Sequence, residues 1–461
     1  MMHIKITEKM HQELKNHLHC GDGLEALAFA ICGRLCNEGQ DFLFVHKLIL
    51  MPYIKCERSE TFVAWKTIDV EPMLEEALEK GFGVVKFHSH FVEGSNFSIL
   101  DDNSDTTFFD SVYGWMNNDL PHSSVIMFPD GSMKGRVIGS DLSFHAVDKI
   151  SIIGHSITGF PSNDKESEVA DAFVRNSQAF GNKTVNTLRN MKIGVVGCSG
   201  TGSPLVEMLF RLGVGTLVLI DSEPLEIENL NRIPSSKLTD VKSKNFKVDV
   251  LKDYIDKTEL GTRVIPYSCL LQESRQALND IASCDFVFGC MDSVEGRHYL
   301  NLISTYYLMP IIDIGVKLVA DGEGGIDSIT GNIHYVIPNL KTLEERGVYS
   351  YGGLAAESLK RISTEEHKNR QAYFENAEVD SPAVISINTA CSSMAVNEML
   401  SRIHPYRNSN NDKYSFTVIN ITEWEISSYE VEETKDKLHS NNIGVGMLEP
   451  NLVLYDSQAD L

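Results

Sequence analysis

The chain has 461 residues, of which 42% are hydrophobic and 23% charged, and its formal net charge is −23 at pH 7. This length suits two or three domains better than one core, and the composition is that of an ordinary globular protein. The negative charge argues against nonspecific binding to nucleic acid or to an acidic membrane, because phosphate groups would be repelled.

The number and spacing of the cysteines and the lengths of the apolar runs indicate in which cellular compartment the protein is expected. The 9 cysteines include no C-x-x-C pair, which is poor material for a disulfide framework or a four-cysteine zinc site. The first residues are followed by polar and charged ones rather than by the apolar stretch of a signal peptide. Apolar runs also stay short of the roughly 20 residues that span a bilayer. We therefore expect a cytoplasmic, soluble protein.

The first part of the chain predicts mixed strands and helices. Apolar runs over 26–32 and 42–50 flank a polar turn at 37–40 and indicate a hairpin. Period and flanking turn residues predict further elements: a helix over 72–80 ending at Gly81, a strand over 83–87, a helix over 98–117, and a hairpin over 123–128 and 135–138.

A possible metal site follows the strand at 83–87. His88 and His90 form H-x-H, and after seven intervening residues Ser98 and Asp101 form S-x-x-D. Strand alternation places both imidazoles on one face. Two imidazoles and one carboxylate are three of the four positions of a catalytic zinc, with the last left open for water. An H-x-H pair alone more often means two half-exposed polar side chains, but the added serine and aspartate favour a metal site. The Ser98 hydroxyl could then hydrogen-bond an oxyanion.

These four residues resemble the metal motif of the JAMM (MPN-plus) metalloproteases, a family of deubiquitinase-like isopeptidases. The resemblance covers roughly residues 1–150 and implies an α+β JAMM metalloprotease domain over 1–155. It implies a glutamate general base that opens an early strand, and Glu25 matches that position; a solvated carboxylate is the alternative. The proline that usually follows the second histidine is Phe91 here, which should reshape the loop without removing a ligand.

A polar interval over 161–168 indicates a domain boundary, with a linker over 156–170. Beyond it, near-continuous apolar strands alternate with helical segments, a pattern that indicates a parallel sheet covered on both faces. The elements expected there are strands at 192–196, 216–220, 285–289 and 310–314, a helix at 203–212, a charged surface crossover at 340–380, a helix at 383–400, and strands near 415–421 in a C-terminal extension over 406–461.

A glycine-rich loop lies between the first of these strands and the helix after it. Gly197, Gly200 and Gly202 form G-x-x-G-x-G, which lets the backbone approach a phosphate at a helix N-terminus. Asp221, after the next strand, would face a ribose. By itself this pattern fits an NAD-dependent dehydrogenase equally well.

The segment 221–232 resembles the D-x-D-x-V-x-x-S-N-L-N-R-Q segment of the ThiF-type adenylyltransferases, the ubiquitin-activating superfamily. The resemblance covers roughly 170–405 and implies a doubly wound, mostly parallel-sheet, Rossmann-like ThiF domain over 171–405, so the whole chain is expected to be α/β. Residues implied for ATP and Mg²⁺ are Gly197, Gly200, Gly202, Asp221, Glu223, Asn229, Arg232, Lys247, Asp292 and Arg175, the last often from the other protomer of a homodimer.

In that family, a protein's C-terminal carboxylate attacks the α-phosphate of ATP and gives an acyl-adenylate and pyrophosphate. Arg232 and a lysine would stabilise the phosphate charge, and Asp292 would hold Mg²⁺. Lys247 keeps the family's local context but implies a two-residue insertion after Asp240, most of which Lys244 would avoid. We favour Lys247, although either could be a solvated lysine on a helix.

Some residues depart from the family pattern. Ser199 stands where a second consecutive glycine is usual, and the C-x-x-C zinc ligands that often flank this fold are absent. Cys391 is expected to be a buried structural thiol, and Cys198 in the loop is no better a nucleophile. We therefore expect adenylation and leave thioester formation open; the adenylate could pass directly to another protein's nucleophile.

Together the motifs predict a bifunctional enzyme of a ubiquitin-like modifier pathway, such as a bacterial conjugation or sulfur-carrier system. Its ThiF domain would adenylate a small ubiquitin-like protein with ATP and Mg²⁺, and its JAMM domain would cleave (iso)peptide bonds with Zn²⁺. A conjugating enzyme or target protein is a further possible partner. One rival is an NAD-dependent oxidoreductase with an accessory metal domain, which Asn229 and Arg232 argue against. The other is a noncatalytic scaffold, for which complete metal and phosphate sets would be surplus.

Overall fold

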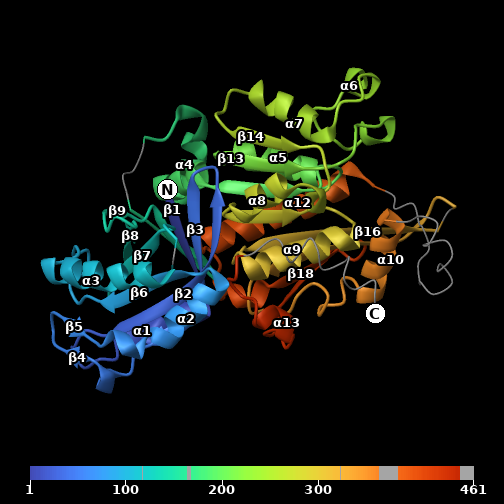
Figure 1. Cartoon of the computed structure of the whole chain (residues 1–461). Helices are drawn as coiled ribbons and strands as arrows, with labels where there is room; N and C mark the ends of the chain where they lie inside the picture. The colour runs from blue at the N-terminus through green and yellow to red at the C-terminus, as the bar shows by residue number, and fades with distance from the viewer. Residues whose placement is uncertain (117, 163–167, 322, 363–382, 447–461) are drawn as a thin grey trace. The chain divides into compact units, whose positions relative to one another are not determined.

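The computed structural model describes residues 1–461 apart from 117, 163–167, 322, 363–382 and 447–461 (Figure 1). The chain divides into two compact units. Unit 1 comprises Met1–Lys165, Tyr306–Leu308 and Asn441–Leu461, and unit 2 comprises Glu166–Thr305 and Met309–Ser440.

Unit 1 is built on a nine-stranded mixed sheet in the order β11-β10-β1-β3-β2-β6-β7-β8-β9. Its strands are β1 (Met2–Thr7), β2 (Leu27–Asn37), β3 (Gln40–Leu50), β6 (Gly83–Ser89), β7 (His122–Met127), β8 (Met133–Ile138), β9 (Phe144–Ala146), β10 (Lys149–Ile153) and β11 (Ile157–Pro161). Its helices are α1 (Glu8–Leu18), α2 (Glu71–Lys80) and α3 (Ile99–Met116), and a small separate sheet holds β4 (Glu57–Arg58) and β5 (Val63–Ala64).

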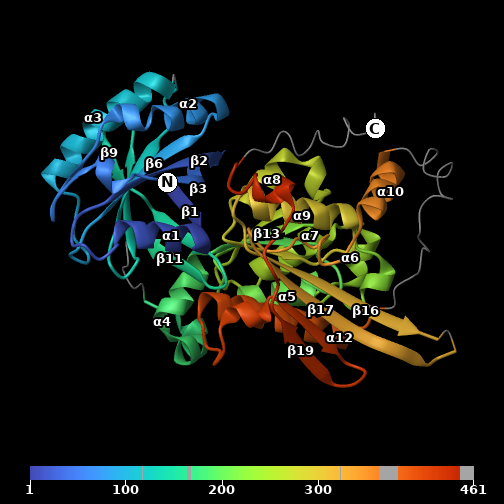
Figure 2. The same ribbon diagram turned by 90° about the horizontal axis from the view of Figure 1, so that it is seen from below.

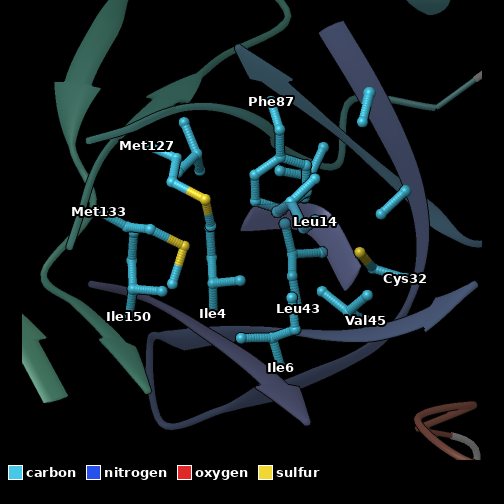
Figure 3. Packing of buried hydrophobic residues seen from close by; sticks show 14 of the residues in the cluster. Ile4, Ile6, Leu14, Cys32, Leu43, Val45, Phe87, Met127, Met133 and Ile150 are labelled. Atoms are coloured by element: carbon cyan, nitrogen blue, oxygen red, sulfur yellow. The ribbon is translucent and has the colours of Figure 1, made fainter. Parts of the chain in front are cut away.

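Side-chain alternation along the strands of unit 1 creates a core on each face of the sheet. On one face, Leu14 of α1 packs with strand residues such as Ile4 and Phe87 (Figure 3). On the other, Phe108 and Phe109 of α3 pack with residues of β2, β6 and α2. Figure 2 shows α1 on one side of this sheet and α2 and α3 on the other. Strand β6 is therefore buried on both faces, with α3 lying over one of them.

The elements expected for unit 1 from the sequence are present, and the structure adds others, among them β4 and β5 between β3 and α2. The hairpin β2–β3, helix α2 with Gly81 as its left-handed C-cap, and hairpin β7–β8 are confirmed. The sequence did not predict β1 and α1, and β1 forms parallel pairs with β10 and β3. The segment 156–170, expected to be a linker, instead begins with β11, which pairs with β10.

A short C-terminal segment also belongs to unit 1. The Gly33 N–H on β2 donates a hydrogen bond to the Gly444 carbonyl at 3.0 Å, and His46 Nδ1 on β3 lies 2.6 Å from the Ile443 carbonyl oxygen. Val445 packs against the core beside α3. The expected C-terminal extension over 406–461 is therefore not one structural element, because its earlier strands belong to unit 2.

Unit 2 contains an eight-stranded sheet in the order β14-β13-β12-β15-β16-β17-β18-β19. Its strands are β12 (Lys192–Val196), β13 (Thr216–Ile220), β14 (Arg263–Tyr267), β15 (Phe286–Gly289), β16 (Ile311–Ala320), β17 (Ile326–Val336), β18 (Phe416–Asn420) and β19 (Glu425–Tyr429). Its helices are α4 (Val174–Asn190), α5 (Gly202–Arg211), α6 (Leu238–Lys242), α7 (Lys247–Asp256), α8 (Arg275–Ala282), α9 (Val294–Tyr306), α10 (Tyr351–Ile362), α12 (Ile385–Ile403) and α13 (Lys437–Ser440).

Each neighbouring pair in the series β14-β13-β12-β15-β16 is parallel. The strands β17, β18 and β19 extend the sheet beyond β16 with antiparallel pairs. Figure 2 shows α5 and α12 on one side of this sheet and α8 and α9 on the other. The expectation of a parallel-rich α/β fold is confirmed for this unit. Parallel strands expose their carboxyl ends at one edge, and the strand order reverses direction between β12 and β15, the point where ligands bind in such sheets.

The expected surface crossover over 340–380 needs correction. It contains α10, and the Glu357 carboxylate of α10 accepts a hydrogen bond from the Val294 N–H at 2.7 Å, so α10 caps the first turn of α9. The remainder, 363–382, lies outside the described residues. The expected helix over 383–400 is α12.

Among the helices that the structure describes, none combines the length and the apolar character that crossing a membrane requires.

Candidate functional site

The metal motif of unit 1 is assembled by β6 and the first turn of α3. His88 is the next-to-last residue of β6, and His90 directly follows the strand. The Asp101 N–H donates to Ser98 Oγ at 3.2 Å, and the Ser98 N–H donates to Asp101 Oδ2 at 2.6 Å. The S-x-x-D spacing is therefore a reciprocal cap of α3, which holds the Asp101 carboxylate at the start of the helix.

Three side chains converge here with the spacing of metal ligands. His88 Nε2 lies 3.2 Å from His90 Nε2 and 3.1 Å from Asp101 Oδ1, and His90 Nε2 lies 3.4 Å from Asp101 Oδ2. Ligands about 2.1 Å from a tetrahedral zinc are about 3.4 Å apart. Within the part of the chain that the structure describes, this is the one group of three or more His, Cys, Asp or Glu side chains close enough to share an ion. The donor set and spacing fit zinc.

The remaining imidazole nitrogens differ in their partners. His90 Nδ1 lies 2.9 Å from Ser95 Oγ, a contact that fixes the ring and leaves Nε2 toward the cluster. His88 Nδ1 is buried and has no hydrogen-bond partner among the described residues. Sequence reasoning missed Ser95, because a serine five residues after a histidine has no distinguishing pattern.

The electrostatics suit a cation. Burial lowers the pKa of His88 and outweighs its hydrogen bond to Asp101, so the imidazole is held in the neutral form that binds metals. Burial alone would raise the pKa of the Asp101 carboxyl, but hydrogen bonds to His88 and His90 outweigh burial and hold that pKa well below its usual range. The cluster thus offers a neutral His88 imidazole and an ionised Asp101 carboxylate, with His90 as the third donor.

Glu25 stands immediately before β2, beside this cluster. Strand β2 pairs with β6 in a register that joins Leu27 to His88, and its continuation places Glu25 opposite His90. The residue is only 5% exposed, so the alternative of a solvated carboxylate is excluded. Burial raises the pKa of Glu25 to about 7. A carboxyl with such a pKa can accept and return a proton near neutral pH.

Ser98 and Phe91 lie at the exposed side of the cluster. Ser98 Oγ accepts the Asp101 N–H, and its hydroxyl hydrogen remains available to a further acceptor. Phe91 is 38% exposed and contacts the ring of His19. With Phe91 directly after His90, both histidines still lie in the cluster.

In unit 2 the glycine loop follows β12, next to the strand-order reversal. The Gly197 N–H donates to the Ile220 carbonyl at 2.8 Å, and Gly197 has a φ of 92°. A Cβ on Gly202 would lie 1.8 Å from the Gly197 carbonyl oxygen. Only glycine therefore permits this tight turn into α5. The loop ends at the N-terminus of α5, as anion binding requires.

Acidic and basic side chains after β13 lie beside the loop. Asp221 Oδ2 accepts the Cys198 N–H at 2.7 Å, and Asp221 Oδ1 accepts the Glu223 N–H at 3.0 Å. Lys247, at the start of α7, is 2% exposed, pairs with Glu223 and lies 3.9 Å from Asp221. Lys244 is exposed in the preceding turn. The structure places Lys247, not Lys244, against Asp221.

Arg232 lies against the loop, and a helix distant in sequence joins it there. A Cβ on Gly200 would lie 3.3 Å from Arg232 Cδ and 2.4 Å from Asn388 Nδ2 of α12. The Ser392 hydroxyl, one turn along α12, donates to the Thr201 carbonyl at 2.7 Å. Sequence reasoning missed Asn388 and Ser392, because α12 carries many other polar residues and nothing in its sequence distinguishes these two.

Other expected residues occupy different places. Asn229 is buried and its side chain accepts the Glu226 N–H at 3.0 Å, so it shapes the turn that carries Arg232. Asp292 is exposed after β15, at the same edge of the sheet as the loop.

Arg175 is exposed on α4. Its neighbour Asn176 donates to the carbonyl of Arg211 at the far end of α5. Arg175 is therefore not brought to the glycine loop of its own chain.

The architecture and loop of unit 2 agree with a comparison against family models. The ThiF family model matches residues 173–441, more than half of the chain. This chain belongs to the ThiF family. Curated relatives include adenylyltransferase and sulfurtransferase UBA4 of Meyerozyma guilliermondii, 29% identical over 30% of this chain and 31% of that protein. Ubiquitin-like modifier-activating enzyme 5 of Dictyostelium discoideum is 26% identical over 33% of this chain and 40% of that protein. The chain thus spans less than half the length of these relatives.

Solved structures similar to the chain include a crystal structure of E. coli MccB. It has a TM-score of 0.44 and 18% sequence identity, and the match covers 59% of this chain and 73% of that one.

The raised pKa of Glu25 predicts a pH-dependent effect of Glu25→Gln on stability. The folded chain keeps the proton between the ordinary value of 4.5 and about 7, where the unfolded chain loses it. The Glu25 contribution to stability therefore falls as pH rises through this window. In chelator-treated protein, Glu25→Gln should raise the free energy of unfolding at pH 8 by about 1–3 kcal/mol relative to its effect at pH 5.

Denaturant unfolding of wild type and variant at both pH values measures this difference. Glu79→Gln, on the exposed face of α2, is the matched control and should show no such pH-dependent gain. An equal effect of Glu25→Gln at pH 5 and pH 8 would contradict the buried, proton-holding state of Glu25.

Proposed function

We propose that this chain is a bifunctional enzyme of a ubiquitin-like modifier pathway. Unit 2 would adenylate the C-terminus of a small ubiquitin-like protein, and unit 1 would cleave peptide or isopeptide bonds as a JAMM-type zinc peptidase. One observation carries the combination: His88, His90 and Asp101 lie at ion-sharing distance in a chain of the ThiF family. A covalent tether gives the two sites a high effective concentration of a shared substrate.

Adenylation is supported by the family and by the names of the aligned relatives, which include adenylyltransferases and a modifier-activating enzyme. In this reaction a carboxylate oxygen of the substrate attacks the α-phosphorus of ATP. The bond from that phosphorus to the bridging oxygen breaks, and pyrophosphate leaves. Arg232 and Lys247 would counter the phosphate charge, and Lys247 would exchange its pairing with the exposed Glu223 for the incoming phosphates. Asp292 would hold Mg²⁺, which offsets the charge of pyrophosphate.

The adenylate would pass directly to another protein's nucleophile. Cys391 and Cys198 are both fully buried. Burial raises the pKa of the Cys391 thiol to about 11 and that of Cys198 well above its usual value, and a thiol must ionise to attack. These two cysteines are therefore poor acceptors for a thioester. Arg175 would reach ATP only from the other protomer of a homodimer.

In unit 1, Glu25 would take a proton from the attacking water and return it to the leaving amine, as its pKa near 7 allows. The Ser98 hydroxyl would donate to the oxyanion of the tetrahedral species, because its oxygen already accepts the Asp101 N–H. Zinc held by His88, His90 and Asp101 would polarise the scissile carbonyl and lower the pKa of water.

Pyrophosphate exchange tests the adenylation half. With ATP, Mg²⁺, labelled pyrophosphate and candidate small ubiquitin-like proteins, the wild-type chain should exchange label into ATP. Arg232→Ala, Asp292→Ala and Lys247→Ala should each lower the rate about 100-fold or more, while the matched control Lys244→Ala stays within about twofold. NAD binding without exchange would instead favour an oxidoreductase, and neither activity with any carrier would favour a scaffold.

Peptide-bond cleavage tests the other half. A ubiquitin-like protein extended beyond its C-terminus by a short peptide should be cleaved by the zinc-loaded wild type. Glu25→Gln should retain zinc and lose cleavage by about 100-fold or more, because proton transfer is removed without a ligand. Glu79→Gln should cleave normally. Cleavage that survives Glu25→Gln, or survives removal of zinc, would exclude the JAMM-type mechanism.

A further inference from the structure

A network of buried charged side chains lies on β6, α3 and β8 next to the cluster of His88, His90 and Asp101. Lys86 is 2% exposed and Asp105 is fully buried. Lys86 Nζ lies 2.6 Å from Asp105 Oδ1, and Arg136 Nε and Nη2 lie 3.0 and 2.8 Å from Asp105 Oδ2. Arg136 also pairs with Asp102. Two cations thus face two carboxylates, and both oxygens of Asp105 are engaged.

We infer that Lys86, Asp105 and Arg136 are positioning residues that set the register of α3 on β6 and thereby place Asp101 beside His88 and His90. This inference rests on the proposed metal site.

The spacing of the network matches that of the ligands. Lys86 and His88 are two residues apart on one face of β6, a step of about 6.6 Å along a strand. Asp105 and Asp101 are four residues apart on one face of α3, a step of about 6 Å along a helix. Strand and helix are therefore joined by two pairs with matching spacing, Lys86–Asp105 at 2.6 Å and His88–Asp101 at 3.1 Å. The ion pair between Lys86 and Asp105 thus sets the position of Asp101 relative to His88.

Arg136, on β8, also contacts the residue that precedes the cap of α3, and so helps to fix the start of the helix. Its guanidinium lies between the rings of Phe97 and Phe144, 4.0 Å from each centroid. Phe97 precedes Ser98, the cap of α3, and its ring centroid lies 6.0 Å from that of His88. Arg136 therefore holds Asp102 and Asp105 by hydrogen bonds and Phe97 by stacking.

Stability alone does not explain this arrangement. Well-packed apolar side chains of similar volume often stabilise a fold as well as a buried ion pair does, because ion pairs carry a large desolvation cost. Phe108 and Phe109, three and four residues after Asp105 on the same helix, already pack α3 onto the sheet. The directional pairing adds a fixed register that apolar contact does not supply.

Zinc affinity and cobalt spectra of the full chain test this inference. Zinc affinity is measured by competition with a chromophoric chelator, and Co²⁺ loading reports coordination geometry through its visible absorption. Asp105→Asn and Arg136→Lys should each weaken zinc binding about 10–100-fold and change the cobalt spectrum. Arg136→Lys keeps the positive charge but loses the planar guanidinium and its stacking on the rings. Lys47→Met, which breaks the exposed pair with Glu76 in the same unit, should stay within about twofold.

The outcomes separate a positioning role from a structural one. If Asp105→Asn or Arg136→Lys retains the circular dichroism of wild type, binds zinc within about threefold and keeps the cobalt spectrum, the inference is overturned. If Asp105→Asn does not fold, Arg136→Lys alone decides. Should wild type bind no zinc, or Asp101→Asn bind it as tightly as wild type, the proposed metal site itself fails and the inference fails with it.

Discussion

The docking of α3 on β6 is the constraint on which the site of unit 1 depends. His88 lies in a strand buried on both faces and His90 directly follows that strand, while the third member of the cluster comes from the helix that covers one face. Apolar packing by Phe108 and Phe109 brings the helix to the sheet, but apolar contact tolerates sliding. The ion pair between Lys86 and Asp105 and the reciprocal cap at the start of α3 are directional. They therefore define the position of the helix along β6.

Unit 2 relies on a different constraint, the common direction of β12, β13 and β15. Because parallel strands have their carboxyl ends at one edge of the sheet, the loops that follow these strands lie next to one another at that edge. The glycine loop, Asp221 and Asp292 come to this edge in that way. Asn388 and Ser392 of α12 then lie against the loop, and the Ser392 hydroxyl donates to the Thr201 carbonyl. A change in α12 would therefore reach the glycine loop through this hydrogen bond and through the close approach of Asn388 to Gly200.

Local patterns in the sequence were sufficient wherever the information is local. The H-x-H and S-x-x-D spacings named the cluster, because strand alternation and helix capping act over a few residues. Lys86 was visible as a lone charge in an apolar strand, but its partner Asp105 and the second cation on Asp105, Arg136, lie 19 and 50 residues away and carry no shared signature. The same limit applies to β1, which pairs with β10 across the length of unit 1, and to Asn388. Burial added what the sequence left open at Glu25, which is 5% exposed, and at Lys247, which is 2% exposed whereas Lys244 is exposed.

Anomalous diffraction at the zinc absorption edge, from crystals of the full chain grown with zinc, tests the central claim most directly. The account requires one strong peak about 2.1 Å from His88 Nε2, His90 Nε2 and an Asp101 carboxylate oxygen, with α3 seated on β6 through the Lys86–Asp105 pair. Fully loaded crystals whose only peaks lie elsewhere, or in which Asp101 has turned away from the histidines, would contradict it.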